Sequence, residues 1–197
     1  MLHPVSTSKA ALRRAASARR AALSPQQRAE SERALAQVVP LLGAGPVAAY
    51  ASVGTEPGTA ALLAVLRDAE VPVLLPVLLP DGDLDWARDD GTLVPGRRGL
   101  PEPAGPRLGP AAVAGCSVVV VPALAVDRTG ARLGRGGGSY DRALARASAL
   151  VVAPLHPGDL LDELPTEPHD VPVDAVVLPG LGLVRLPAYD LTGDLRG

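Results

Sequence analysis

The sequence predicts an α/β fold in which a mostly parallel sheet is covered by helices on both faces. Apolar, β-branched runs alternate along the chain with segments of helical character. The run Ser117–Ala125 lacks polar alternation, which is typical of a strand buried on both faces. We see no internal repeat, and 197 residues fit one domain, 1–197, with a weakly specified tail from about residue 187.

Two helices are expected first. Ser8 to about Leu23 is rich in Ala and Arg, which favours a helix. A second helix should run from Pro25 to about Val39, because Ser24 can cap it and Gln27 can complete a capping box.

The basic N-terminal segment allows two interpretations. No acidic residue precedes Glu30, and Ala, Ser and Arg are abundant. This composition fits a mitochondrial transit peptide, and it also fits the first helix of a mature enzyme. A secretory signal is not indicated, since no apolar core follows the charges.

The remaining elements follow in alternation. Val71–Leu79 holds Pro72 and Pro76, which places this strand at a sheet edge. The Pro-rich segment Val94–Pro110 is expected to be an ordered loop or a lid, and Asp127 to cap a turn. The other expected strands are Val47–Ala51, Asp83–Ala87, Ser117–Ala125, Leu150–Pro154 and Asp174–Leu178, and the other helices are Gly58–Ala69 and Tyr140 to about Ser148.

Composition excludes several classes of function. The net charge of −2 gives no field that would recruit nucleic acid or an anionic membrane, and no apolar run approaches the ~18 residues that span a bilayer. Cys116 is the only cysteine, so no internal disulfide can form; we interpret it as a small buried hydrophobe in preference to a catalytic thiol. One cysteine and three histidines give no support for zinc. We expect a cytoplasmic monomer.

The most specific motif is the glycine-rich run Gly134–Tyr140. Four glycines in five residues let the backbone approach a ligand, and Arg135 and the following helix add positive charge. These features predict an anion site, most naturally for phosphate. The run is neither a Walker A loop nor a good dinucleotide fingerprint. The alternative is a flexible turn that only needs positive φ.

Lys9 is the only lysine among 19 basic residues. A position that keeps lysine in such a chain suggests a need for a compact ammonium group. Arg13 lies on the same helical face, and an anion between the two would relieve their repulsion. The alternative is a solvated basic face.

Carboxylates supply the candidate metal ligands and substrate contacts. Asp141, Asp170 and Asp174 are candidates for magnesium, although Asp174 by spacing alone reads as a solvated strand end. Glu56 follows a strand, where it can bind a ligand, or it can cap the next helix together with Thr59. His169 alone is weak evidence for acid–base chemistry.

These residues form a pattern that resembles the 5-formyltetrahydrofolate cyclo-ligase family, from about Lys9 to Val177. The segments that carry the resemblance are, in order, Lys9-x-x-Leu12-Arg13, Glu56-x-x-Thr59, Glu102-Pro103, Pro122-x-Leu124-Ala125-x-Asp127, Arg132-Leu133-Gly134-Arg135-Gly136-Gly137-Gly138-x-Tyr140-Asp141 and Leu164-Pro165-x-Glu167-x-His169-Asp170-x-Pro172-x-Asp174.

The resemblance implies a function in one-carbon metabolism. ATP and 5-formyltetrahydrofolate, a reduced folate, would give 5,10-methenyltetrahydrofolate, ADP and phosphate with Mg²⁺. It also implies a three-layer α/β/α sandwich of the sugar-isomerase and CoA-transferase type, and an N-terminal helix that belongs to the mature enzyme.

The resemblance also implies site residues. Lys9 and Arg135 would be catalytic. ATP would meet Lys9, Arg13, Arg132, Leu133, Gly134, Arg135, Gly136, Gly137, Gly138, Ser139 and Tyr140. The folate would meet Ala51, Glu56, Arg135, Gly136, Gly137, Gly138, Ser139 and Tyr140. Asp141 and Asp174 would hold Mg²⁺.

Two alternatives are open, and the first is suggested by Ser139, which stands where the family often has a tyrosine. One is a related ATP-dependent enzyme that acts on another formylated or pterin-like substrate. The other is a catalytically silent module that binds a folate or a nucleotide.

Overall fold

The computed structural model describes residues 8–43 and 45–187. Its main sheet has seven strands in the order β12-β11-β9-β6-β1-β2-β3. Their bounds are β1 Val47–Ala48, β2 Val73–Leu78, β3 Leu84–Arg88, β6 Val118–Val120, β9 Leu150–Pro154, β11 Ala175–Leu178 and β12 Gly182–Arg185. The five central strands β11, β9, β6, β1 and β2 are parallel, and only β12 and β3 at the two edges run antiparallel.

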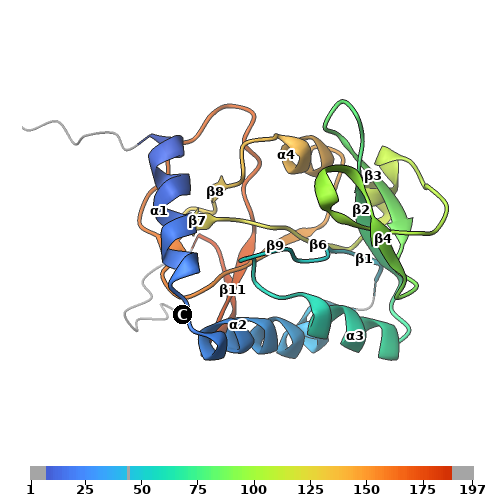
Figure 1. The fold of residues 1–197 in the computed structure, drawn as a ribbon, viewed down its shortest axis with the longest axis horizontal. Helices are drawn as coiled ribbons and strands as arrows, with labels where there is room; N and C mark the ends of the chain where they lie inside the picture. The colour runs from blue at the N-terminus through green and yellow to red at the C-terminus, as the bar shows by residue number, and fades with distance from the viewer. Residues whose placement is uncertain (1–7, 44, 188–197) are drawn as a thin grey trace, which may run out of the picture.

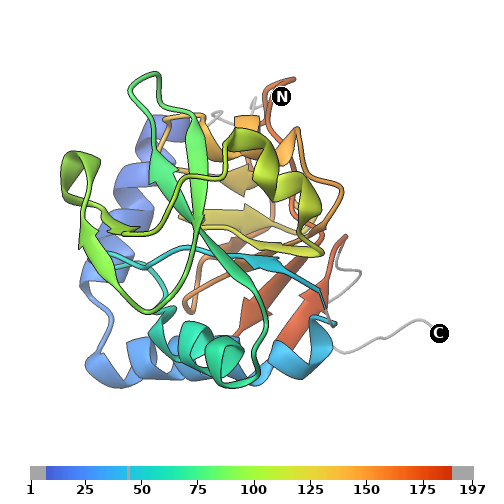
Figure 2. The ribbon, with the colours of Figure 1, turned by 90° about the vertical axis from the view of Figure 1, so that its right-hand side faces the viewer.

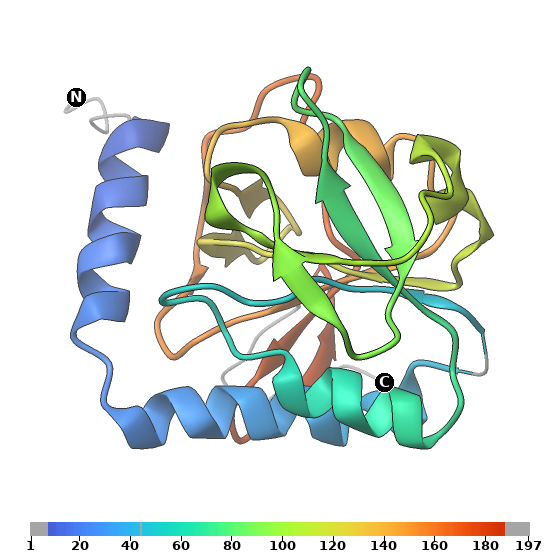
Figure 3. The same ribbon diagram turned by 45° about the vertical axis from the view of Figure 1, so that its right-hand side comes forward.

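Helices cover both faces of this sheet, as Figures 1 and 3 show. α2 (Pro25–Gln37) and α3 (Ala60–Asp68) lie on one face, and α4 (Ser139–Leu144) and the 3₁₀ turn η3 (Pro110–Gly115) lie on the other. A hydrophobic core lies on each face of the sheet, and successive residues of β6 pack into them alternately. Val118 and Val120 pack with α2 and α3, whereas Val119 packs on the other face. The predicted three-layer α/β fold is confirmed.

α1 (Lys9–Ala21) stands apart from the layers and roughly upright against α2 (Figures 1 and 3). It packs through Ala16 against a smaller sheet with the strand order β10-β7-β8. These strands are β7 Ala125–Asp127, β8 Arg132–Leu133 and β10 Leu160–Leu161. The two-stranded pair β4 (Leu93–Pro95) and β5 (Pro101–Pro103) lies next to β2 and forms the light-green lobe at the left of Figure 2.

Several predicted elements are confirmed in detail. α1 and α2 form as expected, and Ser24 and Gln27 exchange both hydrogen bonds of a capping box. Asp127 caps its turn by accepting from the backbone N–H of Thr129 and Ala131. Cys116 is buried, and burial raises the pKa of its thiol, which suits a small hydrophobe.

Three predictions about elements were wrong. β2 is not an edge strand, because β3 lies outside it; Pro76 is tolerated since β1 pairs only with Val73 and Leu74 and ends before it. The run Ser117–Ala125 is not one strand. β6 ends at Val120, and β7 then begins the second sheet at Ala125. α4 also ends at Leu144, short of the predicted Ser148. The predicted C-terminal tail falls largely at residues 188–197, outside the described part.

The capping box at α2 leads to a stability prediction. Ser24→Ala removes the acceptor for the Gln27 N–H, which we expect to lower the free energy of unfolding by about 1 kcal/mol. Urea denaturation measures this change. Gln26→Ala, in the same exposed turn, is the control and should change stability by only a few tenths of that amount. Equal losses in both variants would contradict the role of the cap.

Among the described residues, no helix has the length and apolar composition that a bilayer crossing requires.

Candidate active site

A pocket of about 620 Å³ lies where the parallel strands β1 and β6 end. Tyr50 and Ala51 enter it just after β1, and Pro122 and Ala123 just after β6. Ligands commonly bind at this edge of a parallel sheet, because the loops that follow the strands converge there. The predicted ATP-binding and substrate-binding residues all line the pocket, and they are Lys9, Arg13, Ala51, Glu56, Arg132, Leu133, Gly134, Arg135, Gly136, Gly137, Gly138, Ser139 and Tyr140.

The glycine-rich loop connects β8 to α4 and contacts α1. The Arg13 side chain donates from Nε to the carbonyl oxygen of Gly134 at 2.9 Å. Its guanidinium lies about 3.2 Å from where a Cβ on Gly136 would stand. Gly136 and Gly138 have φ of 96° and 67°, in the left-handed region that favours glycine. The loop therefore needs glycine for conformation and for the approach of Arg13.

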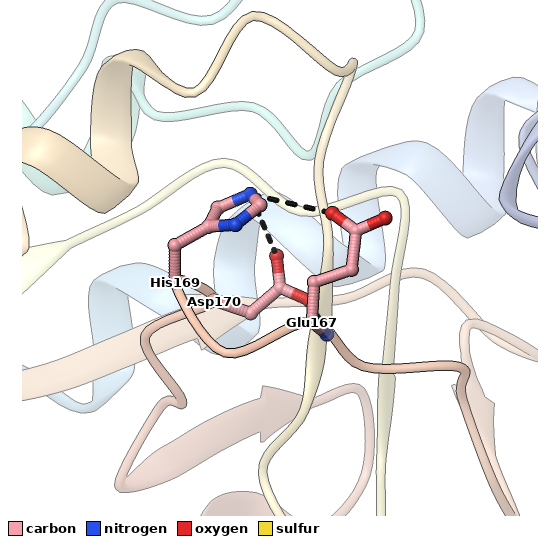
Figure 4. A group of neighbouring side chains, drawn as sticks. All are labelled: Glu167, His169 and Asp170. Atoms are coloured by element: carbon pink, nitrogen blue, oxygen red, sulfur yellow. Dashed lines mark hydrogen bonds and ion pairs between the residues drawn. The ribbon is translucent and has the colours of Figure 1, made fainter.

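Lys9 lies in a cluster of charged groups at one end of the pocket. Its Nζ is 2.6 Å from Oδ2 of Asp170 and 3.4 Å from Oε2 of Glu167. Figure 4 shows that Glu167 and Asp170 face His169 from the same short segment. Burial opposes the charge on Lys9, but the hydrogen bonds and negative charges of Asp170 and Glu167 together outweigh it and raise the pKa of the lysine. Burial likewise opposes the charge on Asp170, but the contact with Lys9 and the backbone N–H of Glu167 together lower the pKa of this carboxyl.

Asp141 follows the loop on α4 and is fixed from two sides. Its Oδ1 accepts from Nη2 of Arg132 at 2.7 Å, and from the backbone N–H of Val171 at 3.4 Å. The second contact joins Asp141 to the segment that carries Asp170. Both carboxylates line the pocket, so it holds an oxygen-rich group of the kind that hard divalent cations prefer.

Tyr140 lies beneath Arg132, whose guanidinium carbon is 6.0 Å from the ring centroid. Burial raises the pKa of the phenol, so Tyr140 stays protonated at neutral pH. Its buried hydroxyl has no hydrogen-bond partner in the described part of the chain, although the residue lines the pocket. A ligand that offers an acceptor would satisfy this donor.

Arg135 and Glu56 form an ion pair, with Nη2 and Oε1 3.0 Å apart. The arginine side chain is 63% exposed, whereas that of Glu56 is 9% exposed. Glu56 is held by the backbone N–H of Val53. Neither reading of helix capping is seen: Thr59 makes no side-chain cap and donates instead to the carbonyl oxygen of Tyr50. Glu56 therefore lies at the pocket beside a largely exposed cation.

Asp174 does not line the pocket. It immediately precedes β11, and its Oδ2 accepts from the backbone N–H of Val151 at the start of the adjacent parallel strand. The amino ends of these strands lie at the opposite edge of the sheet from the loop. The structure therefore does not bring Asp174 to Asp141, and the strand-end interpretation is the one that holds.

Sequence reasoning missed two arginines of the pocket. Arg20 is buried, and its Nε donates to Oδ2 of the buried Asp159 at 2.9 Å. Its spacing of seven from Arg13 puts both on one face of α1, a signal that could have found it. Arg98 enters from the turn between β4 and β5 and carried no such signal.

Known proteins resemble this chain over most of its length. Residues 5–179 match the 5-formyltetrahydrofolate cyclo-ligase family. A 5-formyltetrahydrofolate cyclo-ligase of Mycolicibacterium smegmatis is 48% identical over 148 residues, which cover 71% of this chain and 76% of that protein. The protein of the same name from Escherichia coli K12 is 34% identical over 172 residues, covering 82% of this chain and 94% of the other.

A solved structure is also similar. The 5,10-methenyltetrahydrofolate synthetase of Aquifex aeolicus superposes with a TM-score of 0.77 at 27% identity, over 95% of this chain and 97% of the other.

The fold and the pocket define an α/β enzyme whose glycine-rich loop and cationic side chains form a site for anionic ligands. The chain belongs to the 5-formyltetrahydrofolate cyclo-ligase family, which confirms the resemblance seen in the sequence. Members of this family are ligases that act on a small folate substrate.

Proposed function

We propose that the protein converts 5-formyltetrahydrofolate and ATP to 5,10-methenyltetrahydrofolate, ADP and phosphate in an Mg²⁺-dependent reaction. The observation that carries the proposal is the meeting of three groups in one pocket: the loop cation Arg135, the Lys9–Asp170 cluster from α1 and the segment 167–170, and the buried carboxylate Glu56. A silent binding module would not need to keep all of these charges.

The first step transfers a phosphoryl group. The formyl oxygen attacks the γ-phosphorus, the bond from that phosphorus to ADP breaks, and N5 becomes part of a phosphorylated imidate. The step needs positioning and charge neutralisation more than covalent help from the protein. Lys9, Arg13 and the glycine loop line the pocket, and in this proposal they hold the phosphates. The Arg135 side chain is largely exposed, so in this proposal it exchanges Glu56 for the transferring phosphoryl group and neutralises the negative charge there.

The second step closes the ring. The N10 lone pair attacks the imidate carbon, the carbon–oxygen bond breaks, phosphate leaves with the former formyl oxygen, and N10 loses its proton. Glu56 lies beside Ala51 and Tyr50 after β1, where its carboxylate can accept from the N–H groups of a pterin.

Asp141 and Asp170 both line the pocket, and their carboxylate oxygens are the kind of ligand that Mg²⁺ prefers. Oδ1 of Asp141 also accepts from the backbone N–H of Val171, the residue that follows Asp170. When bound with ATP, Mg²⁺ would neutralise charge on the phosphate oxygens. Lys9 already shares Asp170, so the ammonium and the ion would lie on the same phosphate chain.

An isotope experiment tests the proposed order of bonds. Substrate labelled with ¹⁸O in the formyl group is incubated with the enzyme and MgATP, and the released phosphate is analysed by mass spectrometry. We expect one ¹⁸O atom per phosphate, because the formyl oxygen becomes a phosphate oxygen. Unlabelled phosphate alongside normal product would show that the formyl oxygen never reached phosphorus.

The role of Lys9 gives a kinetic prediction. Lys9→Met should raise the KM for ATP about tenfold, equivalent to about 1.4 kcal/mol, because one cation of the phosphate site is lost. The KM for the folate should change little. Arg14→Met is the control, since Arg14 is exposed on the same helix and does not line the pocket. An unchanged KM for ATP in Lys9→Met would remove Lys9 from the nucleotide site.

A further inference from the structure

The turn Arg97–Gly99 connects β4 to β5, and Figure 3 shows it as the bright-green turn on the side of this pair that faces α1. Arg98 lines the pocket, whereas its neighbour Arg97 does not. Both side chains are exposed, and in residues 8–43 and 45–187 neither guanidinium has a hydrogen-bond or ion-pair partner. Arg98 therefore brings to the pocket a positive charge that no group within the described residues compensates.

The conformation of this turn is fixed by its surroundings. Arg98 has φ 55° and ψ 22°, in the left-handed region that residues other than glycine rarely adopt. The Gly96 N–H donates to the carbonyl oxygen of Leu100 at 2.8 Å. The buried carboxylate of Glu102 accepts from the backbone N–H of Leu78 and Arg97 at 3.2 and 3.3 Å, and it fills the space where a Cβ on Gly96 would stand. Arg98 is therefore held at the pocket by an ordered turn.

The pocket also has an apolar wall. It is formed by Pro76, Leu78 and Leu84 from β2 and β3, and by Leu100 and Pro101 after the turn. Such a wall suits a flat hydrocarbon ring. Glu102 is the acidic group beside this turn, and its carboxylate already accepts from two backbone N–H groups and lies 3.7 Å from Arg107.

The proposed substrate has three parts: a pterin, an aminobenzoyl ring and a glutamate with two ionised carboxylates. Under the proposed function, the reacting formyl group lies at the glycine loop, and the α1 end of the pocket holds the phosphates. The apolar residues and Arg98 line the same pocket and are left for the aminobenzoyl ring and the glutamate. The pocket therefore offers a group suited to each part of the folate.

We propose that Arg98 binds the glutamate carboxylates of the folate tail and makes the enzyme select substrates that carry this glutamate. The inference rests on the proposed function and adds a specificity residue to it. A guanidinium in a pocket is suited to a carboxylate, because its N–H groups match the two oxygens. A hydrogen-bonded charge pair of this kind is expected to change affinity about tenfold.

The test compares two substrates in each variant. One is 5-formyltetrahydrofolate, and the other is an analogue without the glutamate that ends in a neutral benzamide. The wild type should show a KM about tenfold lower for the glutamate-bearing substrate. Arg98→Gln should raise that KM about tenfold and leave the KM for the neutral analogue unchanged, so that the ratio approaches one. The KM for ATP should not change.

Two further variants separate binding from structure. Arg98→Gly removes the guanidinium and suits φ 55°, so it should preserve the turn and again abolish the discrimination. Arg97→Gln is the matched control on the adjacent residue and should keep the wild-type ratio. A wild-type ratio in both Arg98 variants, or an equal rise in both KM values, would overturn the assignment of Arg98. If the wild type formed no methenyl product at all, the proposed function would fail first and the inference with it.

Discussion

Arg135→Gln should reduce kcat by about 10²–10³-fold while the fold remains intact. The arginine side chain is 63% exposed and its partner in the structure is Glu56, so the loss of its charge does not leave a hole in the core. Arg135 is expected to stabilise the transition state, where negative charge spreads over the oxygens of the transferring phosphoryl group. We therefore expect kcat to fall much more than the KM for ATP rises.

Single-turnover kinetics and thermal unfolding measure the two parts of this prediction. Arg128→Gln is the matched control, because Arg128 is exposed, pairs with Asp162 and does not line the pocket. It should behave as the wild type. A kcat for Arg135→Gln within threefold of wild type would show that this loop cation is not used in phosphoryl transfer.

Asp141→Asn should lower turnover about a hundredfold at a fixed, limiting Mg²⁺ concentration. The amide oxygen still accepts from Arg132, so the turn after the glycine loop should survive. What is lost is the negative charge that attracts the cation. The dependence of rate on Mg²⁺ should therefore shift to higher concentrations, and excess Mg²⁺ should restore part of the activity.

Asp174→Asn provides the matched comparison, since it makes the same chemical change at the opposite edge of the sheet. The new amide oxygen can still accept from the Val151 N–H. Titration of the rate with Mg²⁺ should give the wild-type curve for this variant. A curve shifted as in Asp141→Asn would return Asp174 to the metal site and contradict the position that the structure gives it.

The order of elements was largely predictable from the sequence because local signals agree with the fold. The capping box at Ser24 specifies the start of α2 through short-range chemistry, and the apolar run at Val118 predicts a buried strand there, although not where that strand ends. The edge assignment of Val73–Leu78 was wrong for a tertiary reason. Pro76 can occupy an inner strand because the neighbouring strand β1 is only two residues long, which no feature of the strand itself reveals.

Site residues were predictable where both the residue type and its spacing in the sequence indicate ligand binding. The glycine loop, Lys9 and Arg13 are readable as an anion site, and the structure brings all three to one pocket. Arg98 was not predictable, because its place in the pocket depends on how the chain folds at the β4–β5 turn. The location of Asp174 follows from strand direction. Asp174 precedes β11, so it lies at the amino ends of the parallel strands, whereas the pocket loops follow their carboxyl ends.

The most direct test of the account is an absorbance assay with the purified protein, MgATP and 5-formyltetrahydrofolate, which follows the near-ultraviolet band of the methenyl product. The account predicts a rise in absorbance that requires ATP, stops when Mg²⁺ is chelated and is matched by equal amounts of ADP and phosphate. No rise from a folded protein that still binds ATP would contradict the proposed reaction.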